Sequence, residues 1–313
     1  MSKFEVKPTK RTAPIRMIVH GPPGVGKSTF GASAPAPIFL AAEDGLEEIQ
    51  AAAVEPHPKT YEDVLAALDY VATLDRKTLV LDSLDWLEPL VWDHVIRGAA
   101  KKSIKSIEDF GYGKGYIAAL DPWRVIIKKL EFLRTQGMHV ILIAHSIRKT
   151  FKNPLGDDYE QFTIKLHDKA TALFVEWARI IAFCEFDVAT HGDEDKGERV
   201  KALATGRRIL RAIPDPAFLA KSRTVHPLPA KLPLERIGGW DVFAKALIAA
   251  GDETDEATII ALTQQVEERV RALGDAEVEG KVRDFIKTNG PTAATLSEAV
   301  ERLDITINAR KAS

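Results

Sequence analysis

Hydrophobic and polar positions along the chain follow two alternating patterns. Short apolar runs rich in branched side chains predict buried strands. They span residues 15–20, 36–43, 77–87 and 138–146. Between them, residues 60–75 and 121–137 carry apolar side chains at helical spacing, with Thr60 and Asp121 as the expected N-caps. This alternation of strands and helices predicts an α/β fold with a mainly parallel sheet covered by helices.

The pattern changes twice in the second half of the chain. From Arg179 onward, apolar runs predict two or three antiparallel strands, joined by an acidic turn and a glycine turn. Prolines and a glycine pair between His226 and Gly239 then indicate a linker. Beyond it, apolar residues at helical spacing predict a small helical appendage. We expect an N-terminal arm (residues 1–13), an α/β core (14–235) and a helical extension (236–313).

Composition narrows the class of protein. With 313 residues, 45% of them hydrophobic, the chain can bury a full core and one smaller unit. The formal net charge of −2 means that nucleic acid could only be met by a local basic patch. Cys184 is the only cysteine, so no internal disulfide forms, and a reducing compartment is expected. With no apolar run of membrane-spanning length, we expect a soluble cytoplasmic protein.

The first strand leads into a glycine-rich turn with the sequence GPPGVGKST. Its spacing, Gly-x-x-x-x-Gly-Lys-Ser between a strand and a helix, is that of a phosphate-binding loop. In such a loop, backbone amides hold the α and β phosphates, Lys27 reaches the β and γ phosphates, and Ser28 binds Mg²⁺. The expected nucleotide-binding residues are Gly21, Pro22, Pro23, Gly24, Val25, Gly26, Lys27, Ser28 and Thr29. ATP with Mg²⁺ is the expected cofactor.

Three polar residues follow the carboxyl ends of predicted strands, where open α/β sheets bind ligands. Asp82 ends an apolar strand, as a Mg²⁺-binding Walker B carboxylate does, although any buried strand ending in Asp has the same pattern. Glu43 is the candidate catalytic base for water, with a helix-capping role as the alternative. His145 can sense the γ-phosphate, or it can be a core histidine satisfied by hydrogen bonds.

These motifs, in this order, carry a resemblance to a known family. The segments GPPGVGKST, FLAAEDG, TLVLDSLDWL, GYGKGY, VILIAHSIRK and AKSR resemble the RecA-like core of phage-encoded AAA-family ATPases of the single-strand annealing recombinase group. The resemblance covers about residues 14–235. It implies a RecA-like P-loop NTPase core, a mainly parallel sheet ending in an antiparallel meander, with Glu43 as base and His145 as sensor. The histidine replaces a glutamine of the bacterial recombinase, and the usual N-terminal polymerising domain is missing.

The resemblance also implies residues that act between subunits. The segment LAKSRTVHP is similar to the lysine-x-arginine signature by which related ring and filament ATPases complete a neighbour's site. Lys221 and Arg223 are therefore candidates for trans-acting catalytic residues in a homo-oligomer, the alternative being solvated charges on a loop. A single-strand-binding protein is a further partner that the family suggests.

Two segments combine cations with aromatic side chains, the pairing that binds single-stranded nucleic acid without sequence preference. Both contain glycine or proline, and we expect them to be mobile loops like the DNA-binding loops of RecA-like proteins. The candidate DNA-binding residues are Lys101, Lys102, Lys105 and Lys114 in the first segment, and Arg148, Lys149, Phe151 and Lys152 in the second. The alternative is that these lysines lie on water-exposed helix faces and bind no nucleic acid.

The sequence thus predicts a Mg²⁺-dependent ATPase that acts on single-stranded DNA in annealing or strand exchange. A helicase or helicase loader would share every residue named. A small-molecule phosphotransferase, or a switch that binds ATP without appreciable hydrolysis, are further alternatives.

Overall fold

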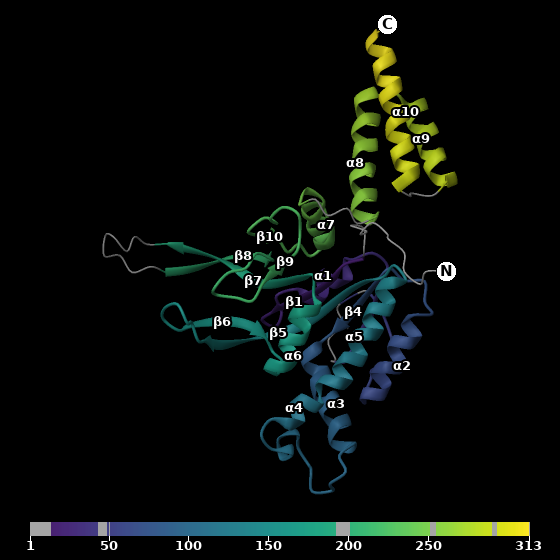
Figure 1. Cartoon of the computed structure of the whole chain (residues 1–313). Helices are drawn as coiled ribbons and strands as arrows, with labels where there is room; N and C mark the ends of the chain where they lie inside the picture. The colour runs from purple at the N-terminus through teal and green to yellow at the C-terminus, as the bar shows by residue number, and fades with distance from the viewer. Residues whose placement is uncertain are drawn as a thin grey trace, which may run out of the picture. The chain divides into compact units, whose positions relative to one another are not determined.

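The computed structural model of the chain describes residues 14–42, 49, 51–191, 201–250, 255–289 and 293–312. Its contacts divide the chain into two compact units. The first comprises residues 14–223 and 227–243, and the second consists chiefly of residues 244–313. The first unit contains the sheet with its covering helices (Figure 1).

The sheet is parallel over most of its width and antiparallel at one side. Its strand order is β10-β8-β7-β1-β5-β4-β2-β3, and β6 and β9 pair with β5 and β7. The strands from β7 through β1, β5, β4 and β2 to β3 run parallel, whereas β8 and β10 continue it as an antiparallel meander. The strands are β1 (Arg16–Gly21), β2 (Pro37–Ala41), β3 (Ala52–Ala53), β4 (Thr78–Asp82), β5 (His139–Phe151), β6 (Tyr159–Ile164), β7 (Ile180–His191), β8 (Lys201–Arg211), β9 (Lys221–Ser222) and β10 (Leu232–Pro233). The predicted fold class is confirmed.

Helices cover both faces of this sheet. Those of the first unit are α1 (Lys27–Ala32), α2 (Tyr61–Val71), α3 (Leu84–Arg97), η1 (Ile107–Phe110, a 3₁₀ helix), α4 (Lys114–Ala118), α5 (Leu120–Thr135), α6 (Asp168–Trp177) and α7 (Gly239–Ala249), the last continuing into the second unit. Buried side chains of α2, α3, α5 and α6 share one core with strand residues such as Leu81 and Leu142. On the other face, α1 packs Gly31 against Val80 and Phe39.

Local sequence signals explain where two of the helices begin. Thr60 and Asp63 form a capping box at the start of α2, each side chain bonding the other's backbone N–H. This confirms Thr60 as the N-cap. The predicted helix at 121–137 is also present, as α5, but Asp121 lies inside its first turn rather than at the cap. A carboxylate in that turn still favours the helix, because it faces the positive end of the helix dipole.

Two element predictions are wrong in part. Residues 77–87 do not form one strand, because β4 ends at Asp82 and α3 begins at Leu84. Leu84, Leu87 and Val91 are buried at helical spacing. Because they follow the apolar residues of β4 almost directly, the two elements have the appearance of one strand in the sequence. Gly206 does not make a turn between strands but lies inside β8 with φ 73°. The predicted acidic turn falls at residues 192–200, which are outside the described part of the chain.

The segment from 146 to 165 is a β-hairpin and not a loop. β5 continues past His145, and its residues Ser146–Phe151 pair antiparallel with Tyr159–Ile164 of β6. Phe151 and Tyr159 stack at the far end of this pairing, with ring centroids 5.0 Å apart. The prediction of a mobile loop is therefore wrong. Both strands of the ribbon carry charged residues, so the alternation of apolar and polar residues that would indicate strands is weak there. In Figure 1 the β5–β6 and β7–β8 ribbons extend beyond the helices.

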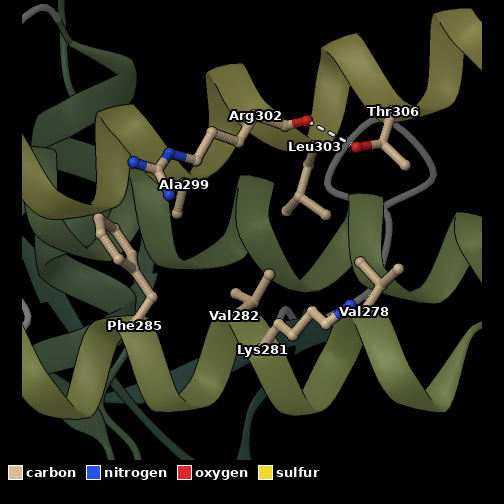
Figure 2. A pocket seen from close by; sticks show the side chains of 8 residues that line it. All are labelled: Val278, Lys281, Val282, Phe285, Ala299, Arg302, Leu303 and Thr306. Carbon is tan, nitrogen blue, oxygen red and sulfur yellow. Dashed lines mark hydrogen bonds between the residues drawn. The ribbon is translucent and has the colours of Figure 1, made fainter.

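The second unit is a helical bundle with its own small core. Its helices are α8 (Asp255–Leu273), α9 (Ala276–Asn289) and α10 (Ala293–Ala312). Val266, Leu296, Ala299 and Leu303 are buried together in this unit. Residues of α9 and α10 line a mainly apolar cavity of ≈ 300 Å³, with Arg302 lying over the Phe285 ring (Figure 2). None of the described helices is both long enough and apolar enough to cross a membrane.

Candidate nucleotide-binding site

The carboxyl ends of four parallel strands meet at one edge of the sheet. Gly21 of β1 lies opposite His145 of β5. Asp82 of β4 lies opposite Ala41 of β2 and Ile143 of β5. The glycine-rich turn, Asp82 and His145 are therefore at the same edge, which is where open α/β sheets bind ligands. Glu43, the predicted base, follows β2 by two positions and lies outside the described residues.

Glycine is required at several positions of the turn between β1 and α1. Gly24 and Gly26 have φ values of 70° and 99°, in the left-handed region that favours glycine. A Cβ on Gly24 would meet no atom within 4 Å, so the turn is open there. A Cβ on Gly21 would lie 2.3 Å from the carbonyl oxygen of Cys184 in β7. Pro22, Pro23, Val25 and Thr29 are the other predicted members of the turn.

Lys27 places a buried cation within this turn. It is the first residue of α1, and its ammonium donates to the carbonyl oxygens of Gly21 (3.2 Å) and Pro22 (2.9 Å). These carbonyls hold the cation inside the loop, where it can exchange them for phosphate oxygens. A buried ammonium in a ring of backbone groups fits a polyphosphate ligand.

Ser28 and Asp82 form the oxygen pair that the metal prediction requires. The Ser28 hydroxyl donates to Oδ2 of Asp82 over 2.6 Å. Burial raises the pKa of Asp82, while the Ser28 hydrogen bond and the Lys27 charge oppose that rise. A hydroxyl and a carboxylate are oxygen ligands suited to Mg²⁺. The residues present therefore fit a nucleoside triphosphate with its metal ion.

His145 is hydrogen-bonded to a carboxylate that the sequence analysis did not identify. Asp85, in the first turn of α3, accepts from the His145 backbone N–H at Oδ1, and its Oδ2 lies 3.0 Å from the ring Nδ1. Although burial opposes the shift, the hydrogen bonds and charge of His145 lower the pKa of Asp85 to about 2. The ionised carboxylate only accepts, so Nδ1 carries the proton and Nε2 is the remaining ring nitrogen. The side chain of His145 is 20% exposed, against 3% for Asp85.

A second histidine connects the phosphate loop to two other segments. His20, immediately before Gly21, is fully buried. Its Nε2 lies 2.7 Å from the Leu219 carbonyl and its Nδ1 lies 2.8 Å from the Ser146 hydroxyl. Because the carbonyl only accepts, Nε2 donates to it and Ser146 donates to Nδ1. Burial lowers the pKa of His20 to about 4, so the ring is neutral near pH 7.

The predicted trans-acting residues have different surroundings. Lys221 donates to the carbonyls of Val175 (2.5 Å) and Ala178 (2.6 Å) at the end of α6 in its own chain. Arg223 is exposed, and its guanidinium forms no ion pair with the residues that the structure describes. Lys221 thus already has a role in stabilising a helix end, whereas Arg223 is available to another chain.

The first candidate DNA-binding segment contacts His167, which lies between the β5–β6 hairpin and α6. Its lysines, Lys101, Lys102, Lys105 and Lys114, are all exposed. Tyr112 is fully exposed with φ 49°. Tyr116 stacks on His167, three residues after β6, with centroids 3.8 Å apart. The first segment therefore touches the chain two residues beyond the second segment, which ends at residue 165.

The cations of the second segment are paired with carboxylates in the same chain. Arg148 pairs with Glu160 at 3.3 Å, Lys149 with Asp168 at 2.5 Å, and Lys152 with Asp158. Phe151 is 45% exposed. Residues 146–165 contain four Lys or Arg and three Asp or Glu, so the positive excess of this hairpin is small.

Asp85 and His20 are the functional candidates that sequence reasoning missed. Asp85 follows Asp82 by three positions, on the helix that the strand prediction concealed. The sequence pattern predicts for His20 only a position at the end of a strand. Their partners lie 60 and 126 positions away along the chain, so no local pattern could reveal these contacts.

The fold and this site define the class of protein. A RecA-like α/β sheet carries a phosphate loop, a buried lysine and a serine–aspartate pair at its carboxyl edge, and these are the parts of a P-loop NTPase. A family model described as an AAA domain, AAA_24, matches residues 13–224, and the chain belongs to this family of P-loop ATPases. Membership implies ATP as the nucleotide.

Solved structures similar to the chain include two archaeal proteins. The flagellar accessory protein FlaH from Methanocaldococcus jannaschii shares 10% identity, covering 72% of this chain and 89% of its own, with a TM-score of 0.36. A KaiC-like protein from Pyrococcus horikoshii shares 14% identity, covering 72% of this chain and 88% of its own, also with a TM-score of 0.36. No curated protein matches the sequence significantly.

Proposed function

We propose that this ATPase uses Mg²⁺ and acts on single-stranded DNA in recombination, by annealing strands or exchanging them. The observation that carries the proposal is the continuity of β5. This strand passes from the nucleotide edge of the sheet, at His145, directly into a hairpin with exposed cations and an exposed aromatic ring. The resemblance to phage annealing recombinases supports the same function.

The nucleotide site supplies the hydrolytic chemistry. Lys27 binds the phosphates as a point charge, and Ser28 with Asp82 would hold Mg²⁺, which neutralises charge on the β and γ oxygens when bound. Glu43 is the proposed base that orients and deprotonates water, because Asp82 is occupied by the metal in this scheme. Arg223 of a neighbouring subunit would add positive charge to the transferring phosphoryl group.

His145 is the proposed link between nucleotide and DNA. Asp85 fixes its ring with Nδ1 protonated, so Nε2 can respond to the γ-phosphate. The next residue, Ser146, begins the hairpin pairing and donates to His20 beside the phosphate loop. A change at the γ-phosphate would thus alter the base of the hairpin through both histidines.

The hairpin surface has the chemistry for single strands. Exposed ion pairs such as Arg148–Glu160 contribute only about 0–1 kcal/mol, so DNA phosphates can replace the carboxylates at little cost. Base stacking on an aromatic ring contributes about 1–3 kcal/mol per base, which assigns Phe151 and Tyr112 larger roles than any single lysine. A homo-oligomer, and a single-strand-binding protein as partner, complete the proposal.

The test measures ATP hydrolysis and DNA binding by the full chain. Single strands should raise the hydrolysis rate, higher salt should weaken the effect, and Glu43→Gln should abolish turnover while ATP still binds. Phe151→Ala should lower affinity for an oligo(dT) strand about 10-fold. Phe132→Ala, at another exposed phenylalanine in α5, is the matched control and should bind as the wild type.

Cation variants complete the test. The double substitution Arg148→Ala and Lys152→Ala should make DNA affinity less sensitive to salt, by the equivalent of about one or two phosphate contacts. Lys128→Ala, at an exposed position of α5, should leave this sensitivity unchanged. Equal binding by Phe151→Ala and the wild type, with no stimulation of hydrolysis by single strands, would overturn the DNA proposal. ATP-driven separation of a duplex would assign a helicase role in place of annealing.

A further inference from the structure

An arginine of the antiparallel meander lies against the phosphate loop. Arg208, in β8, is half-buried, and one of its terminal guanidinium nitrogens lies 3.0 Å from the position that a Cβ on Gly26 would occupy. Its central carbon lies 3.7 Å from the same position. One end of the guanidinium therefore lies beside the loop residue that directly precedes Lys27.

The backbone around Arg208 is held in place from both sides. Arg208 pairs with Phe186 of β7, and its carbonyl accepts the Leu234 backbone N–H over 2.9 Å. Leu234 is buried, and its side chain also lies 3.7 Å from the Gly26 Cβ position. Arg208 is thus presented to the loop by a sheet position, which fixes a side chain better than a loop does.

Among the described residues, no carboxylate compensates the charge of Arg208. Within the described residues its guanidinium forms no ion pair and no hydrogen bond. Neighbouring cations of the same strand differ. Arg211 pairs with Glu185 and Asp215. Lys231, and to a smaller extent Arg207, lower the pKa of Asp187. A half-buried arginine beside an anion-binding turn, with no carboxylate partner among the described residues, is well placed to bind an anionic ligand.

We propose that Arg208 is a nucleotide ligand that binds the α- and β-phosphate end of ATP within its own chain. The loop backbone at Gly26 serves those phosphates, whereas Lys27 reaches toward the γ-phosphate and Ser28 serves the metal. A guanidinium suits this position because its planar fork can donate two hydrogen bonds to phosphate oxygens. The meander thereby becomes part of the nucleotide site.

This role makes a specific kinetic prediction. ATP and ADP both carry α and β phosphates, so the loss of a contact to these phosphates should weaken the binding of both nucleotides. The contact is also present equally in the ground state and the transition state, so its loss raises KM and leaves kcat largely unchanged. Arg208 is therefore distinct from Arg223, whose loss should lower kcat.

The experiment compares Arg208→Met and Arg208→Lys with Arg207→Met in the full chain. Direct titration with fluorescent ADP and ATP analogues gives Kd, and a thermal melt without nucleotide reports the fold. Arg208→Met should raise both Kd values about tenfold, and Arg208→Lys should restore part of the affinity. Arg207→Met, which removes the exposed arginine next along the strand, should bind within about twofold of the wild type.

Two results would overturn the proposal. One is wild-type affinity for both nucleotides in Arg208→Met, including the case in which only the melting temperature falls, since Arg208 then merely packs against the loop. The other is an equal loss of affinity in Arg207→Met, which would indicate a general field effect of β8 cations.

Discussion

At the scale of single residues, Gly21 shows how closely the loop strand is packed. A Cβ there would lie 2.3 Å from the Cys184 carbonyl oxygen in the neighbouring strand, and the backbone cannot yield as a flexible side chain can. Gly21→Ala should therefore destabilise the chain by about 1–3 kcal/mol, measured by denaturant unfolding. Gly98→Ala, where the nearest atom would be 3.4 Å away, is the control and should change stability by less than about 1 kcal/mol.

Glu88 predicts how stability depends on pH. Burial raises its pKa to about 7 from an ordinary 4.5, against the opposing backbone N–H of His167. The folded state then binds more protons than the unfolded state between these values, so stability falls as pH rises through this window. Glu88→Gln carries no charge and should be more stable than the wild type at pH 8, by about 1–3 kcal/mol.

The same comparison near pH 5 provides the check on this prediction. There the wild-type carboxyl is protonated in the fold, so the stabilities of Glu88→Gln and the wild type should converge in chemical denaturation. Glu301→Gln, at an exposed site of α10, should show no such pH-dependent difference. A constant gap between Glu88→Gln and the wild type from pH 5 to 8 would show that Glu88 is ionised throughout.

At the level of elements, Lys221 in β9 and Arg223 just after it have different surroundings, although the sequence predicts the same role for both. Lys221 donates to carbonyls at the end of α6, so Lys221→Met should lower stability by about 1–3 kcal/mol in a thermal melt. Arg223→Ala should leave that melt unchanged and reduce ATP turnover about 10³-fold, because a trans-acting arginine stabilises the transition state. A Lys221→Met variant with normal stability and reduced turnover would instead support the paired role.

Some elements could be read from the sequence and others could not, for physical reasons. The Thr60–Asp63 capping box joins residues three positions apart, so α2 could be located with its N-cap. The β5–β6 hairpin depends on pairs such as Ser146 with Ile164, between strands joined by seven residues of mixed charge (152–158), so the local pattern predicts a loop instead. Similarly, α3 follows β4 so closely that one apolar run covered both.

At the scale of the whole molecule, each compact unit has a core of its own. We therefore expect two unfolding transitions in calorimetry. ATP should raise the transition temperature only of the unit that contains the phosphate loop. Leu303→Ala, in the core of the helical bundle, should lower the other transition through a loss of about 2–5 kcal/mol. Leu130→Ala in α5 is the counterpart and should lower the ATP-sensitive transition. One transition that both substitutions shift equally would show that the units unfold together.

Spacing along the chain is enough to predict the α/β class, the phosphate loop and the position of Asp82 at a strand end. These depend on spacing within a few residues, which backbone geometry turns directly into a turn, a helix or a strand. The contacts between distant groups follow from the folded sheet instead: Ser28 with Asp82, His145 with Asp85, His20 with Ser146, and Arg208 with Gly26. Strand order and register set those contacts, and both arise from packing over the whole sheet.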